Sequence, residues 1–421
     1  MSSIKFVEIG YKPKVEKELI ATFYMEPHKV KFHEAADAVA GESSIGSWTE
    51  LKTLSPKTAV RLKARVFYIN EKKKIIKIAY PMDLFEKGSI PQLLSSLGGN
   101  IFGMKAVKNL RWQDIEFPKK YIDSFMGPAF GIEGIRKILK VKNRVLLGSI
   151  IKPKVGLSAL AQAKLSAVVW LNGIDLIKDD ENLTDMAFNR FEDRVKKVFE
   201  WKRKVEKETK QEKLYACNIT ATPDEMLRRA KLVKKYGGRC VMIDLVSVGL
   251  DNVQYLRKQK LGLIIHGHRA GHAMFTRYKK HGMSMLVLAK LSRLAGIDQL
   301  HTGTVVGKME GNEEEVMTVN NLLKEDWAAY NVVREDWSNI KPVMPIASGG
   351  LHPGLLPKLI EILGQDLIVN FGAGIHGHPD GSAAGARACY QAAEAISKGI
   401  DLKKYAEDHV ELARALEYWK S

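Results

Sequence analysis

From about residue 130 onward, the sequence repeats one unit: a short β-branched run, a few polar or glycine residues, and a helical pattern. The eight apolar runs lie at 145–151, 174–177, 214–219, 240–246, 261–265, 299–303, 343–347 and 367–371. Strands that alternate with helices pair in parallel through right-handed crossovers. Eight such strands are the number that closes a (β/α)8 barrel. A doubly wound open sheet is the alternative, but a chain of this length with eight units fits the barrel better.

The first 125 residues lack this repeat and predict a separate α+β domain. The expected elements are strands at 18–24 and, as a pair, within 60–79, and helices at 32–40 and 90–97. The tail, 383–421, is predicted to be helical. We therefore predict an α/β protein in which an N-terminal α+β (ferredoxin-like) domain, 1–125, precedes a C-terminal (β/α)8 TIM barrel, 126–421.

Composition limits the classes of function. No apolar stretch reaches the length of a membrane span, and residues 1–17 lack the apolar core of a signal peptide, so we expect a soluble, cytoplasmic protein. Cys217, Cys240 and Cys389 show no ligand spacing, which predicts neither disulfides nor a zinc site. The net charge of +18 permits a nucleic-acid partner, but the basic residues are spread along the chain without a recognisable signature. A small polyanionic substrate fits this charge better.

Chemically capable groups gather where the predicted strands end, which is where barrel enzymes place their active sites. Six of the eight runs end in such groups: Lys152 and Lys154, Lys178 to Glu181, His266 to Arg269, His301 to Thr304 with Lys308 beyond, Ser348 to Gly350, and Gly372 to Gly374. Chance placement of surface charge would rarely produce this distribution. We therefore expect an active site at this end of the barrel.

The glycines after the last two runs indicate a phosphate site. Backbone N–H groups at glycines can close around phosphate oxygens, and the loops after strands seven and eight are the usual phosphate site of this fold. Arg269 and His301 could hold a second phosphate across the barrel mouth, because guanidinium offers two parallel donors. The inferred substrate is a linear bisphosphate. The alternatives are ordinary turns for the glycines and a structural role for His301 or His266.

Lys178, Asp180 and Glu181 would lie between the two phosphates. Side chains alternate along a strand, so Lys178 and Asp180 share a face. Two carboxylates suit Mg²⁺ but leave the ion short of protein oxygen ligands. Reaction of the Lys178 amine with CO₂ to form a carbamate would remove its positive charge and supply oxygen. The alternative is that the acids are solvated and cap the following helix.

Several of these segments, in this order, resemble the large subunit of ribulose-1,5-bisphosphate carboxylase/oxygenase (RuBisCO). They are 151–158, 173–182, 266–272, 301–308 and 348–350, and the likeness extends from 42 to 384. The chain is most similar to the archaeal form III type, which works without small subunits. The resemblance implies conversion of ribulose 1,5-bisphosphate, CO₂ and water to two molecules of 3-phosphoglycerate, with O₂ as a competing electrophile. Archaeal relatives suggest a role in AMP and nucleoside salvage.

The resemblance also implies the roles of the reacting groups. The carbamate on Lys178 would hold Mg²⁺ with Asp180 and Glu181 and would remove the C3 proton, while Mg²⁺ stabilises the enediolate. Lys152 would act as acid or base beside the C2 carbonyl and protonate the final carbanion, with Lys154 tuning it.

Further matches concern proton transfer and closure of the site. His268 would shuttle protons at the C3 oxygen. Lys308, at the tip of a mobile loop, would close over the site and polarise CO₂. Glu42 and Asn100 match residues that reach into the barrel of a neighbouring subunit, so the active unit would be a homodimer at least, with a ring of dimers as the larger option.

The remaining matches surround the substrate. Arg269 and His301 match residues that bind one phosphate, and Ser348 and Gly349 lie beside the substrate. The matches around the other phosphate are Ser47, Trp48, Gly350, Gly372 and Ala373.

Three positions depart from the family pattern without removing a catalytic group. Ala373 replaces a glycine, and its Cβ is expected to crowd the phosphate loop. Ser47 stands where threonine is commoner, and Gly271 replaces a methionine, which would loosen packing behind Arg269.

Two rival functions remain. A RuBisCO-like enolase or isomerase would enolise a related sugar phosphate without adding CO₂. Such relatives lose some of the residues that match Lys308, His301, Ser348 and Glu42, and this chain keeps them all. A basic nucleic-acid-binding protein leaves the strand-end residues unexplained.

Overall fold

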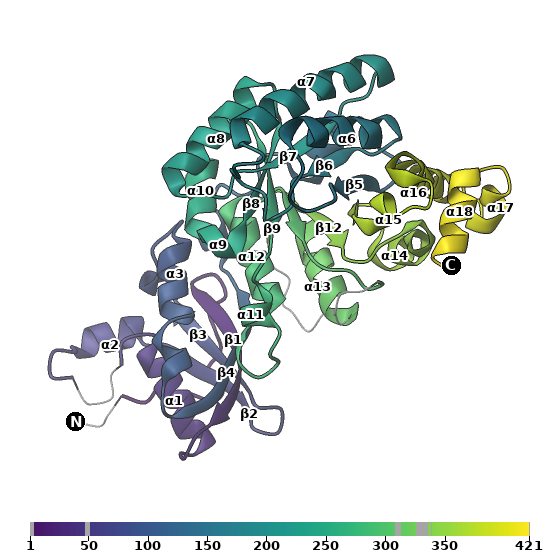
Figure 1. The fold of residues 1–421 in the computed structure, drawn as a ribbon. Helices are drawn as coiled ribbons and strands as arrows, with labels where there is room; N and C mark the ends of the chain where they lie inside the picture. Colours follow the sequence, from purple (N-terminus) through teal and green to yellow (C-terminus); the bar gives the residue numbers. More distant parts are fainter. Residues whose placement is uncertain (1–3, 47–50, 308–312, 326–335, 338, 421) are drawn as a thin grey trace. The chain divides into compact units, whose positions relative to one another are not determined.

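The computed structural model describes residues 4–46, 51–307, 313–325, 336–337 and 339–420, which form two compact units (Figure 1). The first unit comprises Met1–Met126, Gly271–Ala295 and Asp326–Ile340, and the second comprises Gly127–Ala270, Gly296–Glu325 and Lys341–Ser421. The first break lies beside the predicted division between residues 125 and 126. The two later segments of the first unit were not anticipated from the sequence.

The first unit is built on a five-stranded sheet in the order β10-β4-β1-β3-β2. Its strands are β1 (Glu18–Pro27), β2 (Arg65–Asn70), β3 (Ile75–Pro81), β4 (Val107–Glu116) and β10 (Gly282–Met283). Its α-helices are α1 (Phe32–Glu42), α2 (Pro56–Leu62), α3 (Ile90–Leu97), α4 (Lys119–Ile122), α11 (Ala273–Thr276) and α12 (Met285–Ala295). Strands β1 to β4 pair antiparallel, whereas β10 joins β4 in parallel.

One expectation for this unit is corrected. Residues 60–62, which were predicted to begin a strand, form the end of α2. The helix starts there because the Ser55 side chain accepts the Thr58 backbone N–H at 3.1 Å and Pro56 occupies its first turn. The expected strand 18–24 and the expected helices 32–40 and 90–97 are confirmed within β1, α1 and α3.

The second unit is a closed barrel of eight strands in the order β5-β6-β7-β8-β9-β11-β12-β13. The strands are β5 (Leu146–Ile150), β6 (Leu176–Lys178), β7 (Leu214–Asn218), β8 (Cys240–Asp244), β9 (Ile264–His268), β11 (Gln299–His301), β12 (Met344–Ser348) and β13 (Ile368–Phe371). All neighbouring pairs are parallel, and β13 returns to pair with β5. This closure confirms the predicted barrel and excludes the open sheet.

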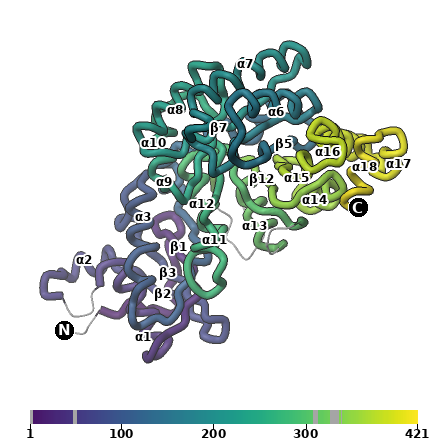
Figure 2. Tube along the Cα trace, in the orientation of Figure 1, coloured from purple at the N-terminus to yellow at the C-terminus, as the bar shows by residue number. Residues whose placement is uncertain are grey.

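Helices follow the barrel strands, as the repeat predicted (Figure 2). They are α6 (Ala159–Leu171), α7 (Phe191–Thr209), α8 (Pro223–Lys235), α9 (Leu245–Val248), α10 (Leu250–Lys258), α13 (Glu313–Lys324), α14 (Leu356–Leu363) and α15 (Ala373–His376). The predicted helical tail consists of α16 (Gly381–Ser397), α17 (Leu402–Ala406) and α18 (Val410–Tyr418). Among the described residues, no helix combines the length and apolar character needed to cross a bilayer.

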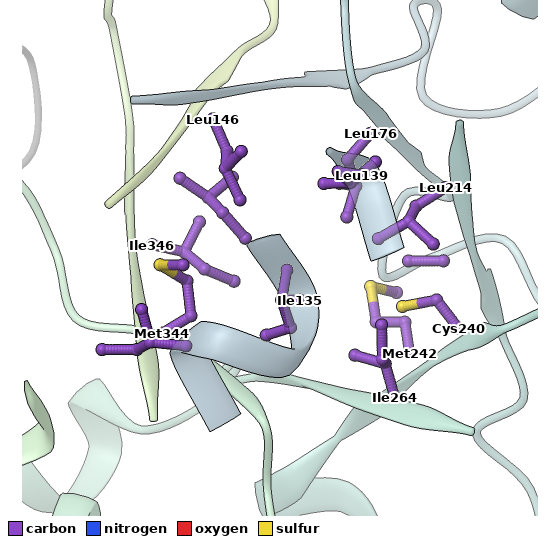
Figure 3. Packing of buried hydrophobic residues seen from close by; sticks show 13 residues of the cluster. Ile135, Leu139, Leu146, Leu176, Leu214, Cys240, Met242, Ile264, Met344 and Ile346 are labelled. Carbon is purple, nitrogen blue, oxygen red and sulfur yellow. The ribbon is translucent and has the colours of Figure 1, made fainter. Parts of the chain in front are cut away.

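Helix α5 (Gly131–Leu139) packs against the amino ends of the barrel strands (Figure 3). Its buried residues Ile132, Ile135 and Leu139 share one cluster with the first residues of seven strands. These first residues are Leu146, Leu176, Leu214, Cys240, Ile264, Met344 and Ile368. Apolar side chains occupy most of this end of the barrel, and the lysines and acids singled out from the sequence lie at the carboxyl ends of the strands. Gln299, the first residue of β11, is a buried polar residue at the amino end.

Strand β9 lies three residues later than predicted, at Ile264–His268 instead of 261–265. His266 and His268 are therefore strand residues and not loop residues. Since side chains alternate along a strand, both histidines face the same side as Ile264, which belongs to the core cluster. This register directs both imidazoles into the barrel.

Candidate functional site

Lys178 ends β6 with its side chain inside the barrel and only 1% exposed. Its Nζ atom donates to the Asp179 backbone carbonyl at 2.9 Å and lies 3.7 Å from Glu181 Oε2. On the other side it lies 3.5 Å from the sulfur of Met242. Burial lowers the pKa of the Lys178 amine, because water that would stabilise the ammonium is excluded.

Two further lysines approach the same acids from the loop after β5. Lys152 Nζ lies 3.1 Å from Asp180 Oδ2, and Lys154 Nζ lies 3.7 Å from Glu181 Oε1. Asp180 is buried, whereas the Glu181 side chain is 25% exposed. The expected cluster of lysines and carboxylates therefore exists, and the reading of these acids as a solvated helix cap is wrong for Asp180.

His268 is held by a carboxylate at the end of the neighbouring strand. Its Nδ1 atom lies 2.7 Å from Asp244 Oδ1, and its Nε2 atom lies 3.7 Å from Glu181 Oε2. An acceptor at Nδ1 favours the tautomer that carries its hydrogen on Nδ1. The Nε2 atom is thereby left facing the acid cluster, where it can exchange a proton with a bound molecule.

A series of buried hydrogen-bonding contacts runs from His266 through His301 to Ser348. His266 Nδ1 lies 2.9 Å from Gln299 Oε1, and the two Nε2 atoms lie 2.9 Å apart. His301 Nδ1 lies 3.0 Å from Ser348 Oγ. Burial lowers the pKa of both histidines well below the ordinary value, so both are neutral at pH 7. His301 thus contributes as a neutral hydrogen-bonding group in this structure.

These buried histidines predict acid sensitivity. Burial also lowers the pKa of His376 to about 4. Below pH ~6.5, His266, His301 and His376 become protonated in the unfolded chain but stay neutral in the folded chain. The free energy of unfolding therefore falls as the pH decreases, by about 1.4 kcal/mol per pH unit for each such histidine. Urea unfolding at pH 7, 6 and 5 measures this slope. A His376→Gln variant should have a shallower slope, and equal stability of the wild type at pH 7 and pH 5 would contradict the prediction.

Arg269 follows β9 and lies against Gly303. A Cβ built on Gly303 would come within 2.8 Å of Arg269 Nη2, and Gly303 has φ +104°, so the glycine makes room for the guanidinium. Burial lowers the pKa of Arg269 to about 10, and it remains a cation at pH 7. Within the described part of the chain, no hydrogen-bond partner occupies this guanidinium. The Glu315 carboxylate acts on it electrostatically, and its N–H groups could donate to an anion.

The glycine loops after β12 and β13 lie close to other parts of the site. A Cβ on Gly307 would come within 2.7 Å of the Gly349 carbonyl, and one on Gly374 within 2.1 Å of the Leu351 carbonyl. A Cβ on Gly372 would lie 3.2 Å from Lys152 Cε, which places this loop beside the acid cluster.

Two departures from the family pattern lie within the described residues. Ala373 is exposed, and the expected crowding of the phosphate loop by its methyl group stays a prediction. Gly271 has φ +82°, a conformation in which a methionine would be strained. The glycine at 271 thus suits the local backbone.

Among the first unit's predicted residues, Glu42 and Asn100 come together. Asn100 Nδ2 lies 3.5 Å from Glu42 Oε1, and both line a surface hollow of about 650 Å³ with Gly99, Gly103 and Met104. Ser47, Trp48 and Lys308 lie outside the described residues, so their roles stay predictions.

Sequence reasoning missed several residues at the site. Asn218 ends β7 and Asp244 ends β8, the third and fourth barrel strands, for which no group was singled out. The strand-end rule could have found both, since each is polar and follows an apolar run. Gln299 had no comparable signal, because its contact with His266 depends on the pairing of β9 with β11.

Known proteins resemble the whole chain. The family description "Ribulose bisphosphate carboxylase large chain, N-terminal domain" matches residues 5–121, and the corresponding catalytic domain matches residues 131–419. A ribulose bisphosphate carboxylase of Methanosarcina acetivorans is 49% identical over 422 residues, which cover 98% of each chain.

Solved structures of archaeal proteins agree with this match. An octameric ribulose-1,5-bisphosphate carboxylase/oxygenase of Pyrococcus horikoshii has a TM-score of 0.93 at 47% identity, covering 98% of this chain and 96% of that one. A dimeric archaeal Rubisco of Hyperthermus butylicus has a TM-score of 0.93 at 44% identity, covering 98% of each chain. With both domain descriptions and full-length relatives in agreement, the chain belongs to the ribulose bisphosphate carboxylase large-chain family.

Proposed function

We propose that this chain is a ribulose-1,5-bisphosphate carboxylase that enolises its substrate, adds CO₂ and releases two molecules of 3-phosphoglycerate, with oxygenation as a side reaction. The observation that carries the proposal is the cluster at the carboxyl ends of the barrel strands. There Lys152, Lys178 and His268 surround the carboxylates of Asp180 and Glu181. Full-length relatives named ribulose bisphosphate carboxylase support the same reaction.

The donor set fits Mg²⁺ if Lys178 is carbamylated. Asp180 and Glu181 offer hard carboxylate oxygens. In the described part of the chain, no three His, Cys, Asp or Glu side chains converge as a complete metal site. A carbamate on Lys178, which lies 3.7 Å from Glu181, would add the further oxygen donor. When bound, Mg²⁺ supplies a Lewis acid that stabilises an enediolate.

The surroundings of Lys178 support the proposed carbamylation. Only the neutral amine attacks CO₂, and burial lowers the pKa of this amine. Attack would form an N–C bond and release one proton from the nitrogen to solvent, so the carbamate would carry one negative charge. Lys152 and Lys154 lie beside the two carboxylates and offset the added negative charge.

The other residues of the site would transfer protons or bind the two phosphates. Lys152 would protonate the carbon derived from C2, and His268, which contacts Asp244, would exchange a proton at the C3 oxygen. Arg269 is the cation for one phosphate, with neutral His301 as a hydrogen-bonding partner. The other phosphate is assigned to the loops that contain Ser348 to Gly350 and Gly372 to Ala373, and to Ser47 and Trp48.

We also propose that the enzyme is a homodimer at least. The solved relatives include a dimeric and an octameric assembly. Glu42 and Asn100, which lie together in the first unit, would complete the site of a neighbouring subunit, where Lys308 would close over the substrate. A role in AMP salvage, which the resemblance to archaeal relatives suggests, stays part of this proposal.

A ¹⁴C-bicarbonate assay with ribulose bisphosphate and Mg²⁺ tests the proposed function. Acid-stable label in phosphoglycerate is expected, and chelation of Mg²⁺ before activation should remove it. Consumption of the sugar phosphate without label would favour the enolase or isomerase and would overturn the carboxylase.

A further inference from the structure

The carboxylate of Asp179 is fully buried and accepts four hydrogen bonds. Its Oδ1 atom accepts from Gln162 Nε2 at 2.7 Å and from the Tyr215 hydroxyl. Its Oδ2 atom accepts from Arg194 Nε at 3.2 Å and from the Asn218 backbone N–H at 2.9 Å. Because a buried carboxylate needs such donors, Asp179 is locked in one orientation.

Asp179 sits between two residues of the acid cluster and points the opposite way. Side chains alternate along an extended chain, so Lys178 and Asp180 turn into the barrel while Asp179 turns outward. There it meets Gln162 of α6 and Arg194 of α7, two helices that pack together. Its anchored side chain therefore fixes the peptide units on both sides.

Asn218 holds the same segment from the adjacent strand. Its Nδ2 atom donates to the backbone carbonyls of Asp180 at 3.3 Å and Glu181 at 3.1 Å. Its Oδ1 atom accepts the Thr220 backbone N–H at 3.1 Å, and its side chain is fully buried. The amide is thus oriented, and it restrains the backbone from which both carboxylates project.

We propose that Asp179 and Asn218 are positioning residues for the proposed metal ligands Asp180 and Glu181. Both act through hydrogen bonds to protein groups, and neither is assigned as a ligand of the metal or the substrate. They set the direction in which the two carboxylates leave the strand end, so that the carboxylates converge before a metal ion arrives. This inference rests on the proposed function. Hydrogen bonds that orient metal ligands typically contribute about 10- to 100-fold to metal affinity.

Asp175, which precedes β6 in the chain, provides a matched control for Asp179. Asp175 is also buried, accepts two hydrogen bonds from Arg144 at 2.6 and 2.8 Å, and accepts the Leu147 backbone N–H at 2.8 Å. It lies one residue before β6, whereas Asp179 lies one residue after it. Replacing either carboxylate disrupts a buried Arg–Asp pair, but only Asp179 adjoins the proposed metal ligands.

The test measures Mn²⁺ binding by electron paramagnetic resonance, with bicarbonate present, in the full-length wild type and three variants. Asp179→Asn and Asn218→Ala are expected to weaken Mn²⁺ binding by about 10- to 100-fold. Asp175→Asn is expected to bind Mn²⁺ like the wild type, although it loses stability in urea. Circular dichroism shows which variants are folded. If Asp179→Asn does not fold, Mn²⁺ binding by Asn218→Ala alone tests the proposed positioning role.

Two results would overturn the inference while leaving the proposed function intact. One is wild-type Mn²⁺ affinity in Asp179→Asn and Asn218→Ala. The other is equal weakening in Asp175→Asn, which would show a general structural effect. Failure of the wild type itself to bind Mn²⁺ with bicarbonate would overturn the metal site, and this inference with it.

Discussion

Replacing Lys178 with methionine is expected to abolish carboxylation while leaving the protein at least as stable as the wild type. Methionine has a similar length but cannot form a carbamate, so one oxygen donor of the proposed metal site is lost. A loss of at least about 1,000-fold is expected, as for other groups on which a whole catalytic unit depends. Stability should not fall, because the buried amine of Lys178 has a lowered pKa and its ammonium form is poorly solvated there. Carbon fixation and urea unfolding measure the two effects.

Lys164→Met provides the control for this substitution. Lys164 is exposed on α6, so activity and stability should both stay close to the wild type. A fully active Lys178→Met enzyme would overturn the carbamate and the metal site. A variant that is inactive and much less stable would instead assign Lys178 a structural role.

Replacing Lys152 with methionine is expected to lower kcat by about 100- to 10,000-fold, the usual contribution of a general acid or base. Its Nζ atom lies 3.1 Å from Asp180, and its Cε atom lies near the loop after β13. Removing the amine takes away the proton carrier but leaves the carboxylates in place. Bicarbonate-dependent Mn²⁺ binding should therefore be retained, which separates this variant from Lys178→Met.

Lys154→Met is the matched control for Lys152. The Lys154 side chain is 55% exposed and lies 3.7 Å from Glu181, so its ion pair is partly screened by water. We expect a loss of less than about tenfold. Comparable losses in the two variants would argue against a specific proton-transfer role for Lys152.

The barrel could be predicted because its signal is local and repeated. Each strand is a short apolar run, and each run is followed by a helical pattern. An error in the bounds of one strand therefore did not change the predicted number of strand–helix units. Strand β9 shows the limit of this approach. Leu261 to Ile265 is continuously apolar apart from Gly262, but Gly262 has φ +71° and turns the chain, so the strand begins only at Ile264. The sequence does not reveal this conformation in advance.

Strand β4 was missed for a related reason. It pairs with β1, but the register between them shifts at Thr22/Phe23 and again at Glu26/Pro27. Such irregularities break the two-residue period on which strand prediction depends. Three consecutive residues of β4, Leu110 to Trp112, are also buried, so this strand lacks the alternation of buried and exposed residues.

By itself, the sequence determined the barrel, the strand ends that carry the chemistry and, through its motifs, the family. These features depend on periodicity and on residues that are neighbours in the chain. Alternation along the strand and the family resemblance already singled out Asp180 and Glu181 as candidate metal ligands, but only the tertiary structure showed what Asp179 contacts. Asp179 turns outward to Arg194, 15 positions away, while Asp180 turns inward to Lys152, 28 positions away. Such partners meet only in the folded chain, because the pairing of β5 with β6 brings Lys152 to Asp180 and the packing of α7 brings Arg194 to Asp179.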